Sequence, residues 1–220
     1  MALDSTLALT TLATVLDELG LTSDSGTQDA RVERYIHTAS QAIEKWCGRN
    51  FCKATVTETM AAPDTQRLYI ARTPLVSVTS VTFYDTVISA DDYEIDNADA
   101  GSIFRRTGWM GDDLAAMGIA GDALRGTKRA NAVSVVYVGG YVTPAQGGTR
   151  TLPYDLEMAC VLTAVSLYRS KGADRRIASE TVGDASVSYG GVNTAIGRGA
   201  GGIIPDEAAA ILEKYRRWSS

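Results

Sequence analysis

The apolar residues change their period near residue 54, and this change constrains the fold more than any other feature of the sequence. Between residues 28 and 48, apolar side chains recur at spacings of three and four, which is typical of one face of a long helix. This stripe consists of Val32, Tyr35, Ile36, Ala39, Ile43, Trp46 and Cys47. From residue 54 the pattern alternates, as in TVTETM, and alternation predicts strands. The fold must therefore combine helices with a sheet.

Helical spacing recurs near both ends of the chain. It predicts helices near residues 11–19, 28–48, 153–171 and 205–217. Gly20 and Gly48 stand where a left-handed residue ends a helix. We expect these helices to pack together and to bury Trp46, Ile36, Ile43, Leu156, Cys160 and Leu212. If Trp46 lies in that core, replacing it with Ala should cost roughly 3–5 kcal/mol.

The middle of the chain predicts five to six strands. VSVTSVTFY follows Pro74 and is rich in β-branched residues, while DDYEID and SIFRR flank a tight turn. AVSVVYVGGY is almost continuously apolar, which favours a central strand. Residues 107–131 and 173–204 are rich in Gly and predict long loops, the second with one short extended segment, ASVSY.

This order of elements predicts an α+β fold. We expect a mainly helical core of four helices, formed by residues 1–53 together with 150–220. A β-rich module at 54–149 is inserted between the second and third long helices. Residues 173–204 form a long Gly-rich loop within the helical part.

Charge and hydropathy narrow the classes of function. The chain has 21 Lys and Arg against 26 Asp and Glu, a formal net charge of −5. A non-specific nucleic-acid binder needs a cationic surface that displaces counterions from phosphates, and the overall charge disfavours that class. No run approaches the roughly 18 apolar residues of a membrane helix, and the first residues lack the pattern of a signal peptide. We expect a cytosolic chain with no membrane partner.

The chain offers few groups for catalysis or metal binding. The three cysteines, Cys47, Cys52 and Cys160, form neither a CxxC motif nor a disulfide framework. His37 is the only histidine and falls on the second predicted helix, whereas a zinc site needs four N or S ligands. A nucleophile would need a base beside it, and no spacing favours paired carboxylates. We therefore expect no catalytic residue and no metal ligand.

Two Gly-rich runs and one acidic cluster have simpler explanations than ligand binding. Residues 121–128, GDALRGTK, place Thr before Lys and so depart from the order of a P-loop. Residues 197–202, GRGAGG, do not follow a βαβ strand, so we expect no cofactor. The acidic residues of 91–99 lack calcium-loop spacing, and a hairpin turn explains Asn97, Asp99 and Gly101.

The C-terminal segment LEKYRRWSS combines aromatic and Arg side chains, which are enriched at protein interfaces. We consider Tyr215, Arg216, Arg217 and Trp218 as candidate partner-interface residues. An ordinary amphipathic helix with a basic last turn explains the same residues, because cations there interact favourably with the helix dipole. The sequence leaves both interpretations open.

Several motifs resemble, in the same order, those of the head–tail connector (adaptor) proteins of long-tailed phages. They extend from about residue 9 to 218 and so cover nearly the whole chain, although many members of that family lack material equivalent to residues 107–131. The motifs are AS at 39–40, IE at 43–44, CGRNF at 47–51, PLVSV at 74–78, YEID at 93–96, GSI at 101–103, VVYVGGY at 135–141, LPYDL at 152–156, IP at 204–205 and YRR at 215–217.

The resemblance implies a structural virion protein without enzymatic activity. Such a protein forms a ring, usually of twelve copies, that docks on the portal protein and links it to the stopper or tail-completion protein. DNA passes through the bore without specific binding, which suits a mildly acidic chain. The resemblance also implies that Tyr215, Arg216, Arg217 and Trp218 reach the portal, that the protein resides in the virion neck, and that it assembles in the host cytoplasm.

Three alternatives stay open from the sequence. A stopper or tail-completion protein of the same neck would be mainly β, and the four predicted helices disfavour it. A small carboxylate-dependent hydrolase would need catalytic groups that no motif supplies. A DNA-binding packaging factor would need the cationic surface that the net charge disfavours.

Overall fold

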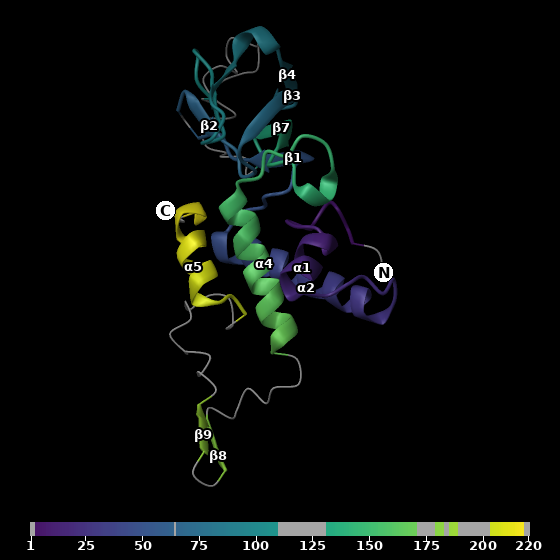
Figure 1. Ribbon diagram of the computed structural model, residues 1–220. Helices are drawn as coiled ribbons and strands as arrows, with labels where there is room; N and C mark the ends of the chain where they lie inside the picture. Colours follow the sequence, from purple (N-terminus) through teal and green to yellow (C-terminus); the bar gives the residue numbers. More distant parts are fainter. Residues whose placement is uncertain are drawn as a thin grey trace. The chain divides into compact units, whose positions relative to one another are not determined.

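The chain divides into two compact units, which we describe separately (Figure 1). The computed structural model describes residues 3–63, 65–109, 131–170 and 203–217, and the backbone of 179–182 and 185–188. One unit comprises residues 1–49 and 142–220, and the other comprises residues 50–141. The sequence predicts 54–149 for the inserted module, whereas in the structure residues 50–53 belong to the second unit and residues 142–149 to the first.

The first two helices begin and end where local sequence signals place them. Helix α1 spans Leu12–Leu19, and its N-cap Thr11 accepts a hydrogen bond from the backbone of Thr14 through its side chain. Helix α2 spans Thr27–Cys47. Gly20 and Gly48 follow the two helices with φ values of 67° and 66°, a conformation that Gly adopts without a steric penalty.

Helix α4 is the centre of the helical unit. It spans Tyr154–Arg169 and contacts α1, α2 and α5, the three other α-helices of the described residues. In Figure 1, α4 (green) lies between α5 (yellow) and the pair α1 and α2. Helix α5 spans Asp206–Leu212 and continues as the 3₁₀ turn η4, Glu213–Tyr215. A second 3₁₀ turn, η3, covers Pro144–Gln146. The four predicted helices are thus confirmed.

Most of the predicted helical core is buried. Ile36, Ile43, Leu156, Cys160 and Leu212 are all fully buried. The prediction for Trp46 is wrong, because this side chain is only half-buried. Trp46 belongs to the last turn of α2, where Arg216 covers its ring from the chain's C-terminal segment with 5.3 Å between guanidinium carbon and ring centre. Trp46 therefore lies at the edge of the core, although Cys47 next to it is fully buried.

The second unit contains two antiparallel sheets. The larger sheet has the strand order β1-β7-β3-β4, and the smaller has the order β2-β6-β5. The larger sheet comprises β1 (Ala54–Met60), β3 (Leu75–Phe83), β4 (Thr86–Ile88) and β7 (Val133–Gly139). The smaller comprises β2 (Arg67–Tyr69), β5 (Glu94–Asn97) and β6 (Ser102–Phe104), with the 3₁₀ turn η1, Ala90–Asp92, before β5. The central position predicted for the strand at 133–139 is confirmed.

The core of this unit contains side chains from both sheets together with Trp109. Trp109 lies next to Phe83, with ring centres 6.1 Å apart in an edge-to-face arrangement. The buried hydroxyl of Tyr137 donates a hydrogen bond of 2.7 Å to Glu58 and accepts one of 3.0 Å from the backbone of Arg72. The core comprises Leu68, Ile70, Leu75, Val81, Phe83, Ile88, Ile103, Trp109, Ala132, Val133, Val135 and Tyr137.

The two ends of the second unit lie side by side. The backbone N–H of Tyr141 donates to the carbonyl of Phe51 over 2.7 Å, and that of Lys53 donates to the carbonyl of Tyr141 over 2.7 Å. Cys52 and Tyr141 form an isolated parallel bridge. The chain therefore enters and leaves this unit through neighbouring backbone segments.

The α+β class is confirmed, whereas the description of the fold as mainly helical is not. Seven strands occupy the described part of the second unit alone. Within 173–204, the structure describes an antiparallel hairpin of β8 (Ser179–Val182) and β9 (Ala185–Ser188). The predicted extended segment ASVSY corresponds to β9, but its partner β8 was predicted as loop. Most of 107–131 lies outside the described residues. No described helix is long and apolar enough to cross a membrane.

Candidate partner interface

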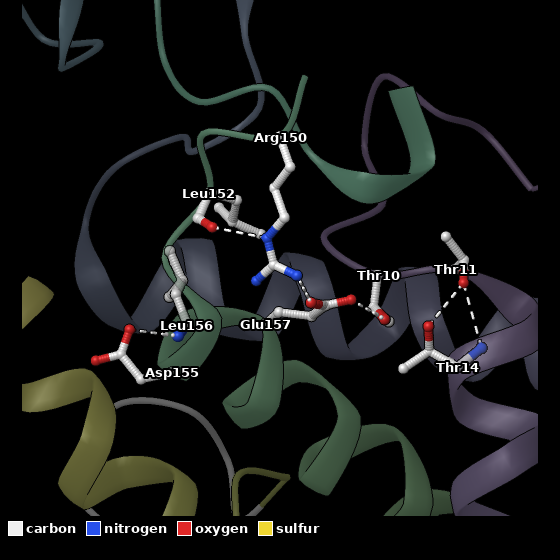
Figure 2. A network of polar contacts seen from close by, with 8 residues as sticks. All are labelled: Thr10, Thr11, Thr14, Arg150, Leu152, Asp155, Leu156 and Glu157. Carbon is white, nitrogen blue, oxygen red and sulfur yellow. Dashed lines mark hydrogen bonds and ion pairs between the residues drawn. The ribbon is translucent and has the colours of Figure 1, made fainter. Parts of the chain in front are cut away.

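The end of helix α5 places Tyr215 against the start of α4. The Tyr215 hydroxyl is half-buried and donates a hydrogen bond of 2.6 Å to Oδ1 of Asp155. The same oxygen accepts the backbone N–H of Leu156 over 2.9 Å (Figure 2), and Oδ2 forms an ion pair with Lys214. Lys214 and Tyr215, which follow α5, and the backbone of Leu156 at the start of α4 thus all bind the carboxylate of Asp155.

These contacts lower the pKa of Asp155. Burial by itself raises the pKa, because it penalises the charged carboxylate. Hydrogen bonds from Lys214, Tyr215 and the backbone of Leu156 favour the charged form and together outweigh burial. Asp155 is therefore held as a carboxylate, and it fastens the C-terminal helix to α4.

Arg216 and Arg217 follow directly and lie at the C-terminal end of α2. The Arg216 guanidinium stacks on Trp46 and lies 3.8 Å from a carboxylate oxygen of Glu213. The backbone N–H of Arg217 donates a 2.8 Å hydrogen bond to the carbonyl of Cys47, one of the acceptors that a helix end leaves unsatisfied. Both Arg residues are exposed, while Trp218 lies outside the described residues. Of the three described candidates, Arg216 and Arg217 are thus exposed at the end of α2, whereas half-buried Tyr215 contacts the start of α4.

A buried polar network ties α4 to two loops, and sequence reasoning missed it (Figure 2). Glu157 forms an ion pair with Arg150 through one oxygen and accepts the Thr10 hydroxyl over 2.9 Å through the other. Arg150 also donates from Nε to the carbonyl of Leu152 over 2.9 Å. Thr10 and Glu157 are 147 positions apart, so no local pattern could pair them. The network fixes the segment before α1 and the segment before α4 to the first turn of α4.

The exposed side of α4 begins beside this network. The Arg150 guanidinium lies 3.8 Å from the ring centre of Tyr154, a cation–π contact. Tyr154 is nevertheless 79% exposed, and Met158, one turn further along, is 45% exposed. The buried carboxylate of Glu157 and the half-buried Arg150 thus lie next to a helix surface that is aromatic and apolar.

The side chains considered above for chemistry, namely His37, the three cysteines and the turn at Asn97, make contacts that stabilise the fold. The ring Nε2 of His37 accepts the backbone N–H of Asp4 over 3.2 Å. All three cysteines are buried, and burial raises the pKa of the Cys47 thiol to about 12, which disfavours the reactive thiolate. In the turn after β5, Asn97 accepts a hydrogen bond from Ala100 over 3.0 Å. No group of three or more His, Cys, Asp or Glu within the described ranges is arranged to hold a metal ion.

Comparisons with known proteins identify related sequences and folds. A family model described as head completion protein matches residues 8–119. A solved chain described as "Neck of empty GTA particle computed with C6 symmetry" matches with a TM-score of 0.58 and 16% identity, covering 100% of this chain and 94% of that one. A second, "Neck of native GTA particle computed with C12 symmetry", has a TM-score of 0.55, 16% identity and the same coverages of 100% and 94%. The comparison with curated proteins gives no significant match.

Proposed function

We propose that this chain, which belongs to the head completion protein family, is a structural adaptor in the head–tail neck of a phage virion. The match to the family over residues 8–119 is the observation that carries the proposal. The matched range includes α1, α2 and six of the seven strands described in the second unit. The fold likeness extends over the whole chain and so includes α4 and α5. The protein acts by shape and contact and has no reaction of its own.

The adaptor works as a ring of identical copies. The two similar folds come from necks computed with C6 and C12 symmetry, and a ring of twelve copies satisfies both. In such a ring each copy contacts the next through two different surfaces. The ring docks on the portal protein, joins it to the stopper or tail-completion protein, and lets DNA through its bore. The net charge of −5 supports passage without tight phosphate binding.

The exposed C-terminal surface serves as the contact with the portal. Arg216 and Arg217 present cations on a segment whose backbone is fastened to α2, and Tyr215 fastens the same segment to α4. A segment held at two points loses little further freedom when it binds, which favours affinity. Tyr215 therefore positions the surface, while Arg216, Arg217 and Trp218 make the contact.

Electron microscopy of purified particles tests the function. The full chain carries an N-terminal tag, which leaves the C-terminal surface unaltered, and a tag-specific antibody fragment marks its position. We expect label at the neck, and heads without tails when the gene is deleted. Label in the tail tube or capsid shell would contradict the proposal, as would normal joining of heads to tails without the protein.

A charge-removal variant tests the C-terminal contact separately. Arg216→Ala/Arg217→Ala should reduce the amount of the protein bound to portal-containing heads at least tenfold. The matched control Arg34→Ala/Lys45→Ala removes two exposed cations from α2 and should bind normally. Equal binding of the two variants would assign the portal contact to another surface.

A further inference from the structure

One face of the four-stranded sheet has no charged side chain. Residues directly opposite each other on paired strands share a face, so the register identifies its members. Every member is exposed or half-buried in the described structure. We call these ten positions the neutral sheet face: Thr55, Thr57, Thr59, Ser77, Ser80, Thr82, Val87, Ser134, Val136 and Val138.

This composition is unusual for a surface in contact with water. The chain as a whole is 21% charged, yet the neutral sheet face contains only Thr, Ser and Val. Val87 is 70% exposed, and Val136 and Val138 lie on the central strand. Depletion of charge is typical of the core of a protein interface. Without a cation the face has no positive charge to release the counterions of DNA phosphates, so the composition favours an uncharged protein surface as its partner.

Helix α4 supplies a second uncharged surface on the same chain. Tyr154, Met158 and Ser166 are exposed and Leu162 is half-buried, and they follow one another at four-residue intervals along a single ridge. We call these four residues the α4 row. The charged neighbours Asp155 and Glu157 are engaged in the contacts with Lys214, Tyr215, Arg150 and Thr10.

We propose that the neutral sheet face of one copy docks on the α4 row of the next copy in the ring. This inference rests on the proposed function, because it assigns the two different surfaces that a ring requires. The surfaces agree in charge, since no member of either one is charged and Arg150, which lies on the Tyr154 ring, is already paired with Glu157. They agree in size as well. The α4 row extends about 18 Å at 1.5 Å per residue, and the seven-residue strands extend about 20 Å.

The size of the contact indicates when it forms. Four strands about 4.8 Å apart make the face about 14 Å wide, so it offers on the order of 300 Å². A stable pair of proteins buries about 800 Å² on each partner. Two copies joined only here would separate in solution. In a closed ring each copy makes the contact twice, and docking to the portal adds further area, so the contact belongs to the assembled ring.

Photo-cross-linking in assembled particles tests the pairing. Benzoylphenylalanine replaces Tyr154 in the full chain, and irradiated particles are analysed by gel mass and peptide sequencing. We expect a species of twice the chain mass, with the cross-link in β1, β3, β4 or β7 of the second copy. A cross-link to another segment, to a different protein or within one chain would overturn the inference, as would no cross-link in particles that contain the ring.

Charged substitutions provide the second test. Val87→Glu and Met158→Glu each place a charge in the contact and should lower incorporation into necks at least tenfold. The controls Tyr69→Glu on β2 and Thr38→Glu on α2 add a charge at exposed positions elsewhere and should assemble normally. Circular dichroism and thermal unfolding show whether each variant is folded. Normal incorporation of folded Val87→Glu or Met158→Glu would overturn the inference. The adaptor function would still be upheld if the wild-type protein is labelled at the neck.

Discussion

The hydroxyl of Tyr215 and the carboxylate of Asp155 are joined by a hydrogen bond of 2.6 Å, although 60 positions separate them in the sequence. This bond connects the last turn of the chain described here to the first turn of α4. It gives Tyr215 a structural role that is separate from any partner. We therefore expect its loss to affect folding as well as assembly.

Removing the hydroxyl measures this bond. Tyr215→Phe should lower the free energy of unfolding by about 1 kcal/mol, because a carboxylate then loses one donor at a partly exposed site. Chemical denaturation of the purified protein gives the value. Tyr154→Phe removes the hydroxyl of a ring that is 79% exposed and should change stability by less than about 0.5 kcal/mol. Equal effects of the two variants would contradict the role of the bond.

The lowered pKa of Asp155 predicts a dependence of stability on pH. Its folded pKa lies below the ordinary value of 3.8, so the unfolded chain binds the proton more readily. The stabilising contribution is therefore present above that ordinary value and disappears as the pH falls through the lower folded pKa. Unfolding curves from neutral pH to about pH 3 should fall less steeply for Asp155→Asn than for the wild type. Parallel curves would show that the charge of Asp155 does not contribute to stability.

The ion pair of half-buried Arg150 with buried Glu157 predicts a non-additive result. Glu157→Leu leaves the Arg150 charge without its partner and should cost about 3 kcal/mol or more. The double variant Arg150→Met/Glu157→Leu removes both charges and should be more stable than the single variant. Denaturant unfolding of the two proteins provides the comparison. A double variant less stable than Glu157→Leu would indicate that Arg150 acts mainly through Tyr154 and Leu152.

Trp46 and Ile43 lie on the same helix, but Ile43 is fully buried and Trp46 is only half-buried. Their removal should therefore lower the free energy of unfolding by different amounts. Ile43→Ala creates a cavity in the core and should cost about 2–5 kcal/mol. Trp46→Ala loses half-buried apolar area and the contact with Arg216, for a cost of about 1–2 kcal/mol. Thermal unfolding of both variants measures the difference, with exposed Lys45→Ala as the reference. A larger loss for Trp46→Ala would place its ring in the core after all.

Gly140 tests the close backbone contact at the edge of the second unit. Its φ is 98°, and an added Cβ would lie 2.6 Å from the carbonyl oxygen of Cys52 and 2.8 Å from that of Phe51. Gly140→Ala should therefore cost at least about 3 kcal/mol. At Gly20, with φ of 67°, nothing lies within 4 Å of such a Cβ, so Gly20→Ala should cost only about 1 kcal/mol. Comparable midpoints of unfolding for the two variants would rule out the steric explanation.

Local signals explain why the helices were predictable. Apolar spacing along α2 and the glycines at positions 20 and 48 depend only on residues close in sequence. The three-residue strand β4 has too few positions for a periodic signal, and it was missed. Trp109 was placed in a loop because Gly-rich sequence surrounds it, although its ring is fully buried.

The candidate surface was less predictable than the fold. Aromatic and Arg composition indicated the C-terminal residues, but not that Tyr215 would reach Asp155 or that Arg216 would cover Trp46. The neutral sheet face depends on the pairing of β7 with both β1 and β3, and the order of strands is a non-local property. Each strand on its own shows only alternating Thr and Val, a pattern that any half-exposed sheet has. The sequence therefore does not indicate an uncharged face.

The adjacent entry and exit of the sheet unit at Phe51, Lys53 and Tyr141 have a consequence for how such proteins diversify. A segment whose ends meet can be exchanged for a longer, shorter or unrelated one without stretching the helices that carry it. Natural selection can then alter the sheets to suit a new neighbour while the helical scaffold stays the same. Grafting residues 50–141 into the helical unit of a distant relative would reproduce this exchange in the laboratory.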